Sequence, residues 1–263
     1  MHVLGISCYY HDSAAALIQD GLLVAAAEEE RFSRIKHDNG FPHHAIDFCL
    51  QQAGIVPEDL DYVVFYEKPL LKFERILLTA LATFPKSFGT FREASIAWLN
   101  EKLWVKGTIL DKLNLPPDRL LFVEHHLSHA ASAFFCSPYK ESAILTVDGV
   151  GEWTTASIGS GHTYWDSDRD PDSRHSAIDL VREIKFPHSL GLLYSAFTAF
   201  LGFRVNEGEY KVMGMAPYGE PRYLDLIDKV FRVRDDGSFQ LDLDYFCFHH
   251  STRRTFNDKF VRL

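Results

Sequence analysis

The sequence of 263 residues has few cysteines, fewer basic than acidic residues and no long apolar run. Its four cysteines are scattered and none forms a CxxC pair, which excludes a zinc ribbon or a thioredoxin-type motif and is typical of a reducing cytosol. There are 27 Lys and Arg against 36 Asp and Glu, a formal net charge of −9, so a nucleic-acid partner is not expected.

The longest mostly apolar stretch, residues 190–203, is shorter than the roughly 18 residues that suggest a membrane span. The N-terminus also lacks the basic start and apolar run of a signal peptide. We therefore expect a cytoplasmic protein with no membrane contact. Hydrophobic residues make up 46% and charged residues 24%, which is typical of a globular chain.

The first part of the chain, residues 1–138, predicts an α/β lobe. Apolar runs predict strands at 3–7, 14–18, 22–27, 62–66 and 120–123, with a tight turn at Asp20-Gly21. Helical patterns cover 43–53, which Gly54 should end, and 74–113, which Pro85 should break, and a further helix should begin with HHLSHAASAFF.

Residues 139–263 repeat the opening pattern of strand, turn and returning strand at 143–147 and 154–158, which indicates an internal duplication and a second lobe. A polar loop is predicted at 162–174, where Asp166, Asp168, Asp170 and Asp172 fit a solvated segment better than a calcium loop. A strand at 177–186 and helices at 190–201 and 223–233 follow, around the glycine-punctuated VNEGEYKVMGMAPYG. Because fewer elements follow than in the first lobe, the second lobe is expected to be truncated.

The most distinctive motif places His125 and His129 four residues apart at a helix start, on one helical face and able to bind one cation. A histidine near a helix N-terminus also tends to stay neutral and available as a ligand. A zincin protease is excluded because His126 occupies the place of the catalytic Glu. The alternative is that the two histidines only pack at the helix start.

Asp148 follows an apolar strand and precedes Gly149 and Gly151. Its carboxylate could join the two histidines on Fe(II), or on Zn or Mn, and the glycines would let backbone amides approach an anion. The alternative is an ordinary Asp-Gly turn.

Two further segments could contact a ligand. The turn from Cys8 to Ser13 offers hydroxyls, amides and the His11 imidazole to a phosphate, unless it is only a polar hairpin loop. The segment 206–211 offers Glu209 and Lys211, which otherwise are surface charges. The acidic-to-basic run at 28–37 predicts a solvated face.

Five segments together resemble the O-carbamoyltransferase family of nodulation-factor and antibiotic-tailoring enzymes: VLGISCYYHDSAAALIQDG, AAEEERFSRIKHD, HHLSHAASAFFCSPY, ILTVDGVGEWTT and SLGLLYSAFTAFLGFRVNEGEYKVMGMAPYG. The resemblance implies an actin- and sugar-kinase-like fold of two ribonuclease H-like lobes. It implies a metal on His125, His129 and Asp148, and nucleotide phosphates at the loop around His11, Asp12 and Ser13 and at 148–151. It also implies that Lys36, Glu209 and Lys211 lie near the nucleotide or the acceptor.

The implied reaction has two stages. Carbamoyl phosphate and ATP give carbamoyl adenylate, and the carbamoyl group then passes to a hydroxyl of a small molecule, with His11 as a hypothetical base. The resemblance further implies a C-terminal adenylate-forming domain that this chain lacks, so the isolated chain is expected to be inactive or to bind metal weakly.

Three other functions stay open. A sugar kinase or phosphohydrolase could use the same fold, although its Mg²⁺ prefers oxygen ligands to imidazole. A relative that transfers threonylcarbamoyl to tRNA would have to bind RNA despite the charge of −9. A non-catalytic metal- or nucleotide-binding subunit is the third.

Overall fold

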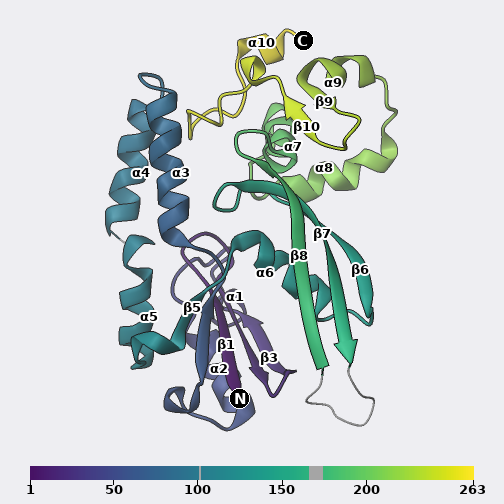
Figure 1. Cartoon of the computed structure of the whole chain (residues 1–263). Coiled ribbons are helices and arrows are strands. Elements are labelled where there is room, and N and C mark those ends of the chain that lie inside the picture. Colours follow the sequence, from purple (N-terminus) through teal and green to yellow (C-terminus); the bar gives the residue numbers. More distant parts are fainter. Residues whose placement is uncertain (101, 166–173) are drawn as a thin grey trace. The chain divides into compact units, whose positions relative to one another are not determined.

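The computed structural model describes residues 1–100, 102–165 and 174–263 as a mixed α/β chain (Figure 1). Its contacts divide it into two compact units. The first consists of Met1–Phe73 and Ser95–Ser128, and the second of Glu74–Ala94 and His129–Leu263.

The first unit contains a five-stranded sheet in the order β3-β2-β1-β4-β5. Its strands are β1 (His2–Ser7), β2 (Ala14–Gln19), β3 (Leu22–Glu28), β4 (Tyr62–Phe65) and β5 (Leu120–Phe122). β1 to β3 form an antiparallel meander, and β4 and β5 join in parallel. The strands predicted from the sequence are confirmed. Asp20 and Gly21 both have positive φ, as a two-residue hairpin turn requires.

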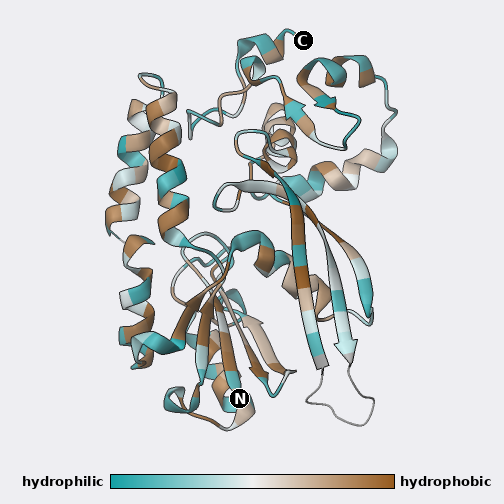
Figure 2. Ribbon diagram, viewed as in Figure 1, coloured by the Kyte–Doolittle hydropathy of each residue, from teal (hydrophilic) through white to brown (hydrophobic). Residues whose placement is uncertain are grey.

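One face of this sheet is covered by helix α2 (His43–Ala53), whose predicted end at Gly54 is confirmed by a φ of 67° and bonds to Leu50 and Gln51 carbonyls. Alternate residues of β1 and β4 are buried, as the two-residue period of a strand requires. Figure 2 shows these strands as mostly hydrophobic ribbon. The core includes Leu4, Ile6, Leu17, Val63 and Phe65. Each such side chain contributes about 1.5–3 kcal/mol relative to exposure.

Between β4 and β5 the chain is helical, as predicted, and the expected break at Pro85 is confirmed. The helices are α3 (Pro69–Ala82), α4 (Phe88–Asn100), the 3₁₀ turn η2 (Lys102–Trp104) and α5 (Val105–Leu113). The first helix starts at Pro69 rather than the predicted residue 74, because a proline is well tolerated in the first turn of a helix. Short elements nearby are α1 (Glu30–Ser33), η1 (Pro57–Asp59) and η3 (Pro117–Arg119).

Helix α6 (His125–Phe134) leads into the second unit, whose main sheet has the order β6-β7-β8. These strands, β6 (Glu141–Val147), β7 (Thr154–Trp165) and β8 (Arg174–Lys185), form an antiparallel meander like that of β1 to β3. The repeated pattern seen in the sequence therefore recurs in the strand topology. The polar loop predicted from residue 162 is wrong at its start, because β7 continues to Trp165 by pairing with β8. The four alternating aspartates lie outside the described residues.

The rest of the second unit packs around an aromatic core. Its elements are α7 (Leu190–Phe200), α8 (Glu209–Met215), η5 (Ala216–Tyr218), α9 (Leu224–Val230), β9 (Phe231–Val233), β10 (Phe239–Leu241), η6 (Leu243–Tyr245) and α10 (Asp258–Val261). The helix predicted over 223–233 is three residues too long, because Phe231 to Val233 pair with β10 instead. The core residues include Val230, Leu241, Phe246 and Phe260.

Two further findings bear on the sequence-based expectations. All four cysteines are free thiols. Within the described part of the chain, no helix is long and apolar enough to cross a membrane.

The half-buried His249 makes the second unit sensitive to acid. Burial, with the charges of His250 and Lys86, lowers the pKa of His249 from 6.5 to about 4. Between these two pH values the unfolded chain binds more protons than the folded one, so the free energy of unfolding falls as the pH drops. We expect His249→Gln to make this fall in the free energy of unfolding smaller by about 1 kcal/mol, a value discounted because the His249 side chain is partly exposed.

Urea unfolding of both proteins at pH 7.5 and pH 5 measures the effect. His162→Gln on β7 is the matched control, and we expect it to leave the pH dependence unchanged. An unaltered pH dependence in His249→Gln would contradict the prediction.

Candidate functional site

The first turn of α6 is fixed to the end of strand β4. The Val123 amide donates to the Phe65 carbonyl (3.0 Å), and the Ser128 hydroxyl donates to the Tyr66 carbonyl (2.9 Å). With the helix held at these points, His125 is buried, and His129 lies one turn later and is exposed. Both imidazoles are carried by helix α6.

Asp148 lies directly after β6, in a loop attached to the start of helix α7. The Asp148 amide donates to Thr155 O (2.9 Å), and one carboxylate oxygen accepts from the Gly149 amide (2.6 Å). The Ser189 hydroxyl lies 3.1 Å from Asp148 O and 2.7 Å from Gly149 O, and it also accepts from the Leu192 amide as the N-cap of α7. One serine therefore caps the start of the helix and also bonds to the loop.

The loop and α7 also approach each other too closely for a side chain at Gly191. A Cβ at this position would lie 2.5 Å from Asp148 O and 2.6 Å from Gly149 N. At the other end of the loop, the buried Arg75 donates to Gly151 O (3.0 Å). The backbone that carries Asp148 is thus held from several sides.

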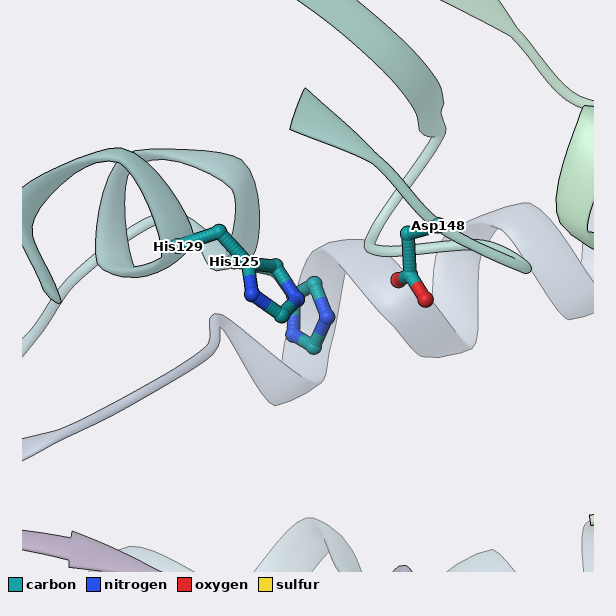
Figure 3. A group of neighbouring side chains, drawn as sticks. All are labelled: His125, His129 and Asp148. Atoms are coloured by element: carbon teal, nitrogen blue, oxygen red, sulfur yellow. The ribbon is translucent and has the colours of Figure 1, made fainter. Parts of the chain in front are cut away.

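His125, His129 and Asp148 are the residues for which the sequence predicts a metal site. One potential ligand atom from each lies within 4.8 Å of those of the other two. Figure 3 shows the two rings close together, with the carboxylate turned toward them. Two imidazole nitrogens and a carboxylate suit Fe(II), Zn or Mn, and three protein ligands leave coordination positions open.

The loop after β1 forms a second polar group. The Asp12 carboxylate lies between two imidazoles, 2.8 Å from His11 Nδ1 and 2.9 Å from His37 Nδ1, and Glu30 accepts from the His37 amide (2.9 Å). Burial favours the neutral form of Asp12, but the hydrogen bonds from His37 and His11 outweigh it and hold its pKa below the usual value. His11 itself is about half exposed.

Sequence reasoning placed Glu30 and His37 on a solvated face and missed this arrangement. Asp12, Glu30 and His37 are close enough to be considered as a ligand set. However, His37 Nδ1 already bonds to the Asp12 carboxylate, and the His37 backbone amide bonds to the Glu30 carboxylate. Asp12 and His37 both have a left-handed φ, of 50° and 57°. Such backbone positions are not visible as a periodic pattern in the sequence.

The predicted phosphate contacts Ser13, Gly149 and Gly151 already bond within the chain. Ser13 is buried, and its hydroxyl donates to Asp38 O (2.7 Å). The Gly149 and Gly151 amides bond to Asp148 and to Thr154 O, so an anion there would have to displace these acceptors.

Two predicted ligand contacts lie in the first turn of α8, and a third lies after α1. The Glu209 carboxylate accepts from the Ser195 hydroxyl (2.9 Å) and the Asn206 amide (3.1 Å), which ties α7 to α8. Lys211 and Lys36 are exposed.

Comparison with known proteins identifies the class. A family model described as Carbamoyltransferase N-terminus matches residues 2–263. The chain therefore belongs to the carbamoyltransferase N-terminus family.

Two relatives illustrate the family. "Uncharacterized protein sll1178" of Synechocystis is 52% identical over 273 residues, which cover 100% of this chain and 42% of that protein. "Nodulation protein NolNO" of Sinorhizobium fredii is 36% identical over 244 residues, covering 90% of this chain and 32% of that protein. The chain thus spans less than half the length of these relatives.

Two solved structures show a weaker likeness. YeaZ from Pseudomonas aeruginosa has a TM-score of 0.35 and 14% identity, covering 71% of this chain and 66% of that one. Component A of (R)-2-hydroxyglutaryl-CoA dehydratase from Acidaminococcus fermentans has a TM-score of 0.36 and 12% identity, covering 84% and 70%.

The close approach at Gly191 leads to a test of the Asp148 loop. We expect Gly191→Ala to force the loop away from α7, to lower the free energy of unfolding by about 1–3 kcal/mol and to weaken binding of a divalent cation. Urea unfolding and Co²⁺ titration measure the two effects.

Gly214→Ala is the matched control, because a Cβ at this helical glycine would meet no atom within 4 Å. It should leave cation binding unchanged and stabilise the chain by about 0.5–1 kcal/mol. If Gly191→Ala were as stable as the unsubstituted protein, the contact with Asp148 would not constrain the loop.

Proposed function

We propose that this chain is the N-terminal part of an ATP- and metal-dependent O-carbamoyltransferase. It would act with a C-terminal adenylate-forming domain, in the cytoplasm, to move a carbamoyl group from carbamoyl phosphate, through carbamoyl adenylate, to a hydroxyl of a small molecule. The observation that carries the proposal is the grouping of His125, His129 and Asp148 in a chain matched by the family over nearly its whole length.

We also propose an actin-like fold of two ribonuclease H-like lobes, 1–138 and 139 onward. The support is the same antiparallel meander in both sheets, β1 to β3 and β6 to β8. On this model Asp148 follows the first strand of the second lobe, at the position that His11 and Asp12 occupy after the first strand of the first lobe. The two polar loops would then be equivalent positions of the two lobes.

The donor set fits a divalent cation. His125 and His129 contribute neutral nitrogen ligands, and Asp148 contributes a negative oxygen ligand. A cation bound there would polarise a phosphoryl or carbonyl oxygen and stabilise the charge that develops as AMP leaves. The part played by the chain is to hold the three side chains in place, through the fixed first turn of α6 and the Ser189 contacts.

His11 is the residue we propose as the general base. Its Nδ1 bonds to Asp12, so the neutral ring would carry its proton there and present Nε2 to an incoming hydroxyl. Asp12 also bonds to His37, which fixes the carboxylate that orients His11.

The other residues predicted to contact the nucleotide or the acceptor would act in different ways. Ser13 is buried with its hydroxyl on Asp38 O, so we propose that it shapes the loop and offers no side chain to the nucleotide. Gly149 and Gly151 would contribute backbone amides. Lys36 and Lys211 are exposed and could meet phosphate or acceptor, and Glu209 would act by positioning the start of α8.

The metal centre is tested first by elemental analysis of anaerobically purified protein. We expect near-stoichiometric Fe or Zn in the unsubstituted protein and loss of that metal in His125→Ala/His129→Ala, because two of three ligands are removed. His162→Ala/His175→Ala removes two imidazoles elsewhere and should retain the metal. Equal trace metal in all three proteins would contradict a metal centre.

The base is tested by carbamoyl transfer in the complete protein. We expect His11→Asn to lower the rate of transfer to the hydroxyl about 10²–10⁴-fold, while formation of carbamoyl adenylate continues. Full transfer activity in His11→Asn would exclude His11 as the base.

A further inference from the structure

A buried ion pair lies just beyond strand β4. Glu67 is 7% and Lys72 is 8% exposed, and Lys72 Nζ lies 2.5 Å from Glu67 Oε2. Neither residue belongs to the sites described above. Since desolvating two charges is costly, a buried pair of this kind is weak evidence for a role in stability alone.

The same carboxylate oxygen faces the first candidate metal ligand. Glu67 Oε2 lies 3.7 Å from Nδ1 of His125, whose imidazole is also buried. Both residues, and Lys72, belong to the first contact unit. Glu67 Oε2 therefore lies between the Lys72 ammonium and the Nδ1 side of the His125 ring.

Two tyrosine rings, those of Tyr66 and Tyr10, lie next to these polar side chains. The Tyr66 ring packs against His125 with centroids 5.5 Å apart, and burial, together with the Glu67 charge, raises the pKa of Tyr66 far above its usual value. The Lys72 ammonium also lies 5.0 Å from the centroid of the Tyr10 ring. The carboxylate and its two neighbours, Lys72 and His125, are all buried.

Metal-binding histidines usually donate their second ring N–H to a carboxylate or carbonyl, which fixes the tautomer and the ring orientation. We propose that Glu67 is the positioning residue for His125: its carboxylate lies 3.7 Å from Nδ1 and would accept from that nitrogen when the ring binds the cation through Nε2. This inference rests on the proposed metal centre. Lys72 holds the carboxylate in place.

Glu124 provides a useful contrast. It directly precedes His125 in the chain, but its side chain is exposed and pairs with Lys68 (2.8 Å). Glu67 and Glu124 therefore carry equal charge near the same helix start, and only Glu67 faces the imidazole. A purely electrostatic effect would involve both residues, whereas orientation of His125 would involve Glu67 alone.

The test compares Co²⁺ binding by the complete protein with binding by Glu67→Gln and Glu124→Gln, using the visible absorption of the bound ion. We expect Glu67→Gln to weaken Co²⁺ binding about 10–100-fold and to alter the absorption spectrum. Glu124→Gln should leave both unchanged. In the Zn²⁺-loaded protein with ¹⁵N-labelled histidine, the His125 Nδ1–H signal should be present and should shift in Glu67→Gln.

Removing Glu67 leaves Lys72 buried without its partner, so Glu67→Gln could unfold. In that case Co²⁺ binding is measured on the charge-balanced variant Glu67→Gln/Lys72→Met. Thermal unfolding shows whether this variant is folded. Weak Co²⁺ binding by this folded variant supports the proposal.

Two negative results are distinguishable. If the unsubstituted protein binds no Co²⁺, the proposed metal centre fails and the role of Glu67 fails with it. If the unsubstituted protein binds Co²⁺ and the folded Glu67 variants bind it with equal affinity and the same spectrum, only the role of Glu67 is overturned.

Discussion

Two hydrogen bonds at the end of strand β4 determine where His125 lies. Val123, just before helix α6, and Ser128, in its first turn, bond to the Phe65 and Tyr66 carbonyls, on either side of His125. A helix turns about 100° per residue, so a slip of one residue would change the direction of the His125 imidazole. The sheet that contains β4 therefore sets the position of His125, and its core residues matter to that position without touching any ligand.

Polar groups at both candidate sites are oriented by other polar groups. Asp12 lies between His11 and His37, and Glu67 lies between Lys72 and His125. Each carboxylate therefore contacts a proposed site residue, His11 or His125, and a second side chain, His37 or Lys72. Such paired contacts reduce the freedom of an imidazole before any ligand arrives, which is the kind of preorganisation that metal binding and proton transfer need.

Much of the fold could be predicted because periodicity and turn residues are local. Strands β1 to β5, the end of α2 at Gly54 and the break at Pro85 follow from apolar alternation, a positive-φ glycine and a proline. The end of α9 and the extent of β7 could not, because they depend on pairing with β10 and β8, which no local pattern reveals.

The same distinction applies to the candidate site. His125 and His129 are four residues apart on one helix, so their shared face was predictable. Asp148 could be placed only by its position after a strand and by the resemblance to a family. Glu67 and His37 were missed because their partners, His125 and Asp12, are distant in sequence.

The absence of space for a side chain at Gly191 has a consequence for the mobility of the loop that carries Asp148. The Asp148 carbonyl oxygen would lie 2.5 Å from a Cβ at position 191, so the loop backbone is in close contact with the first turn of α7. Atoms packed this closely transmit a displacement to their neighbours. A shift of the loop backbone would therefore also move the start of α7, so that the two respond as one part of the second unit.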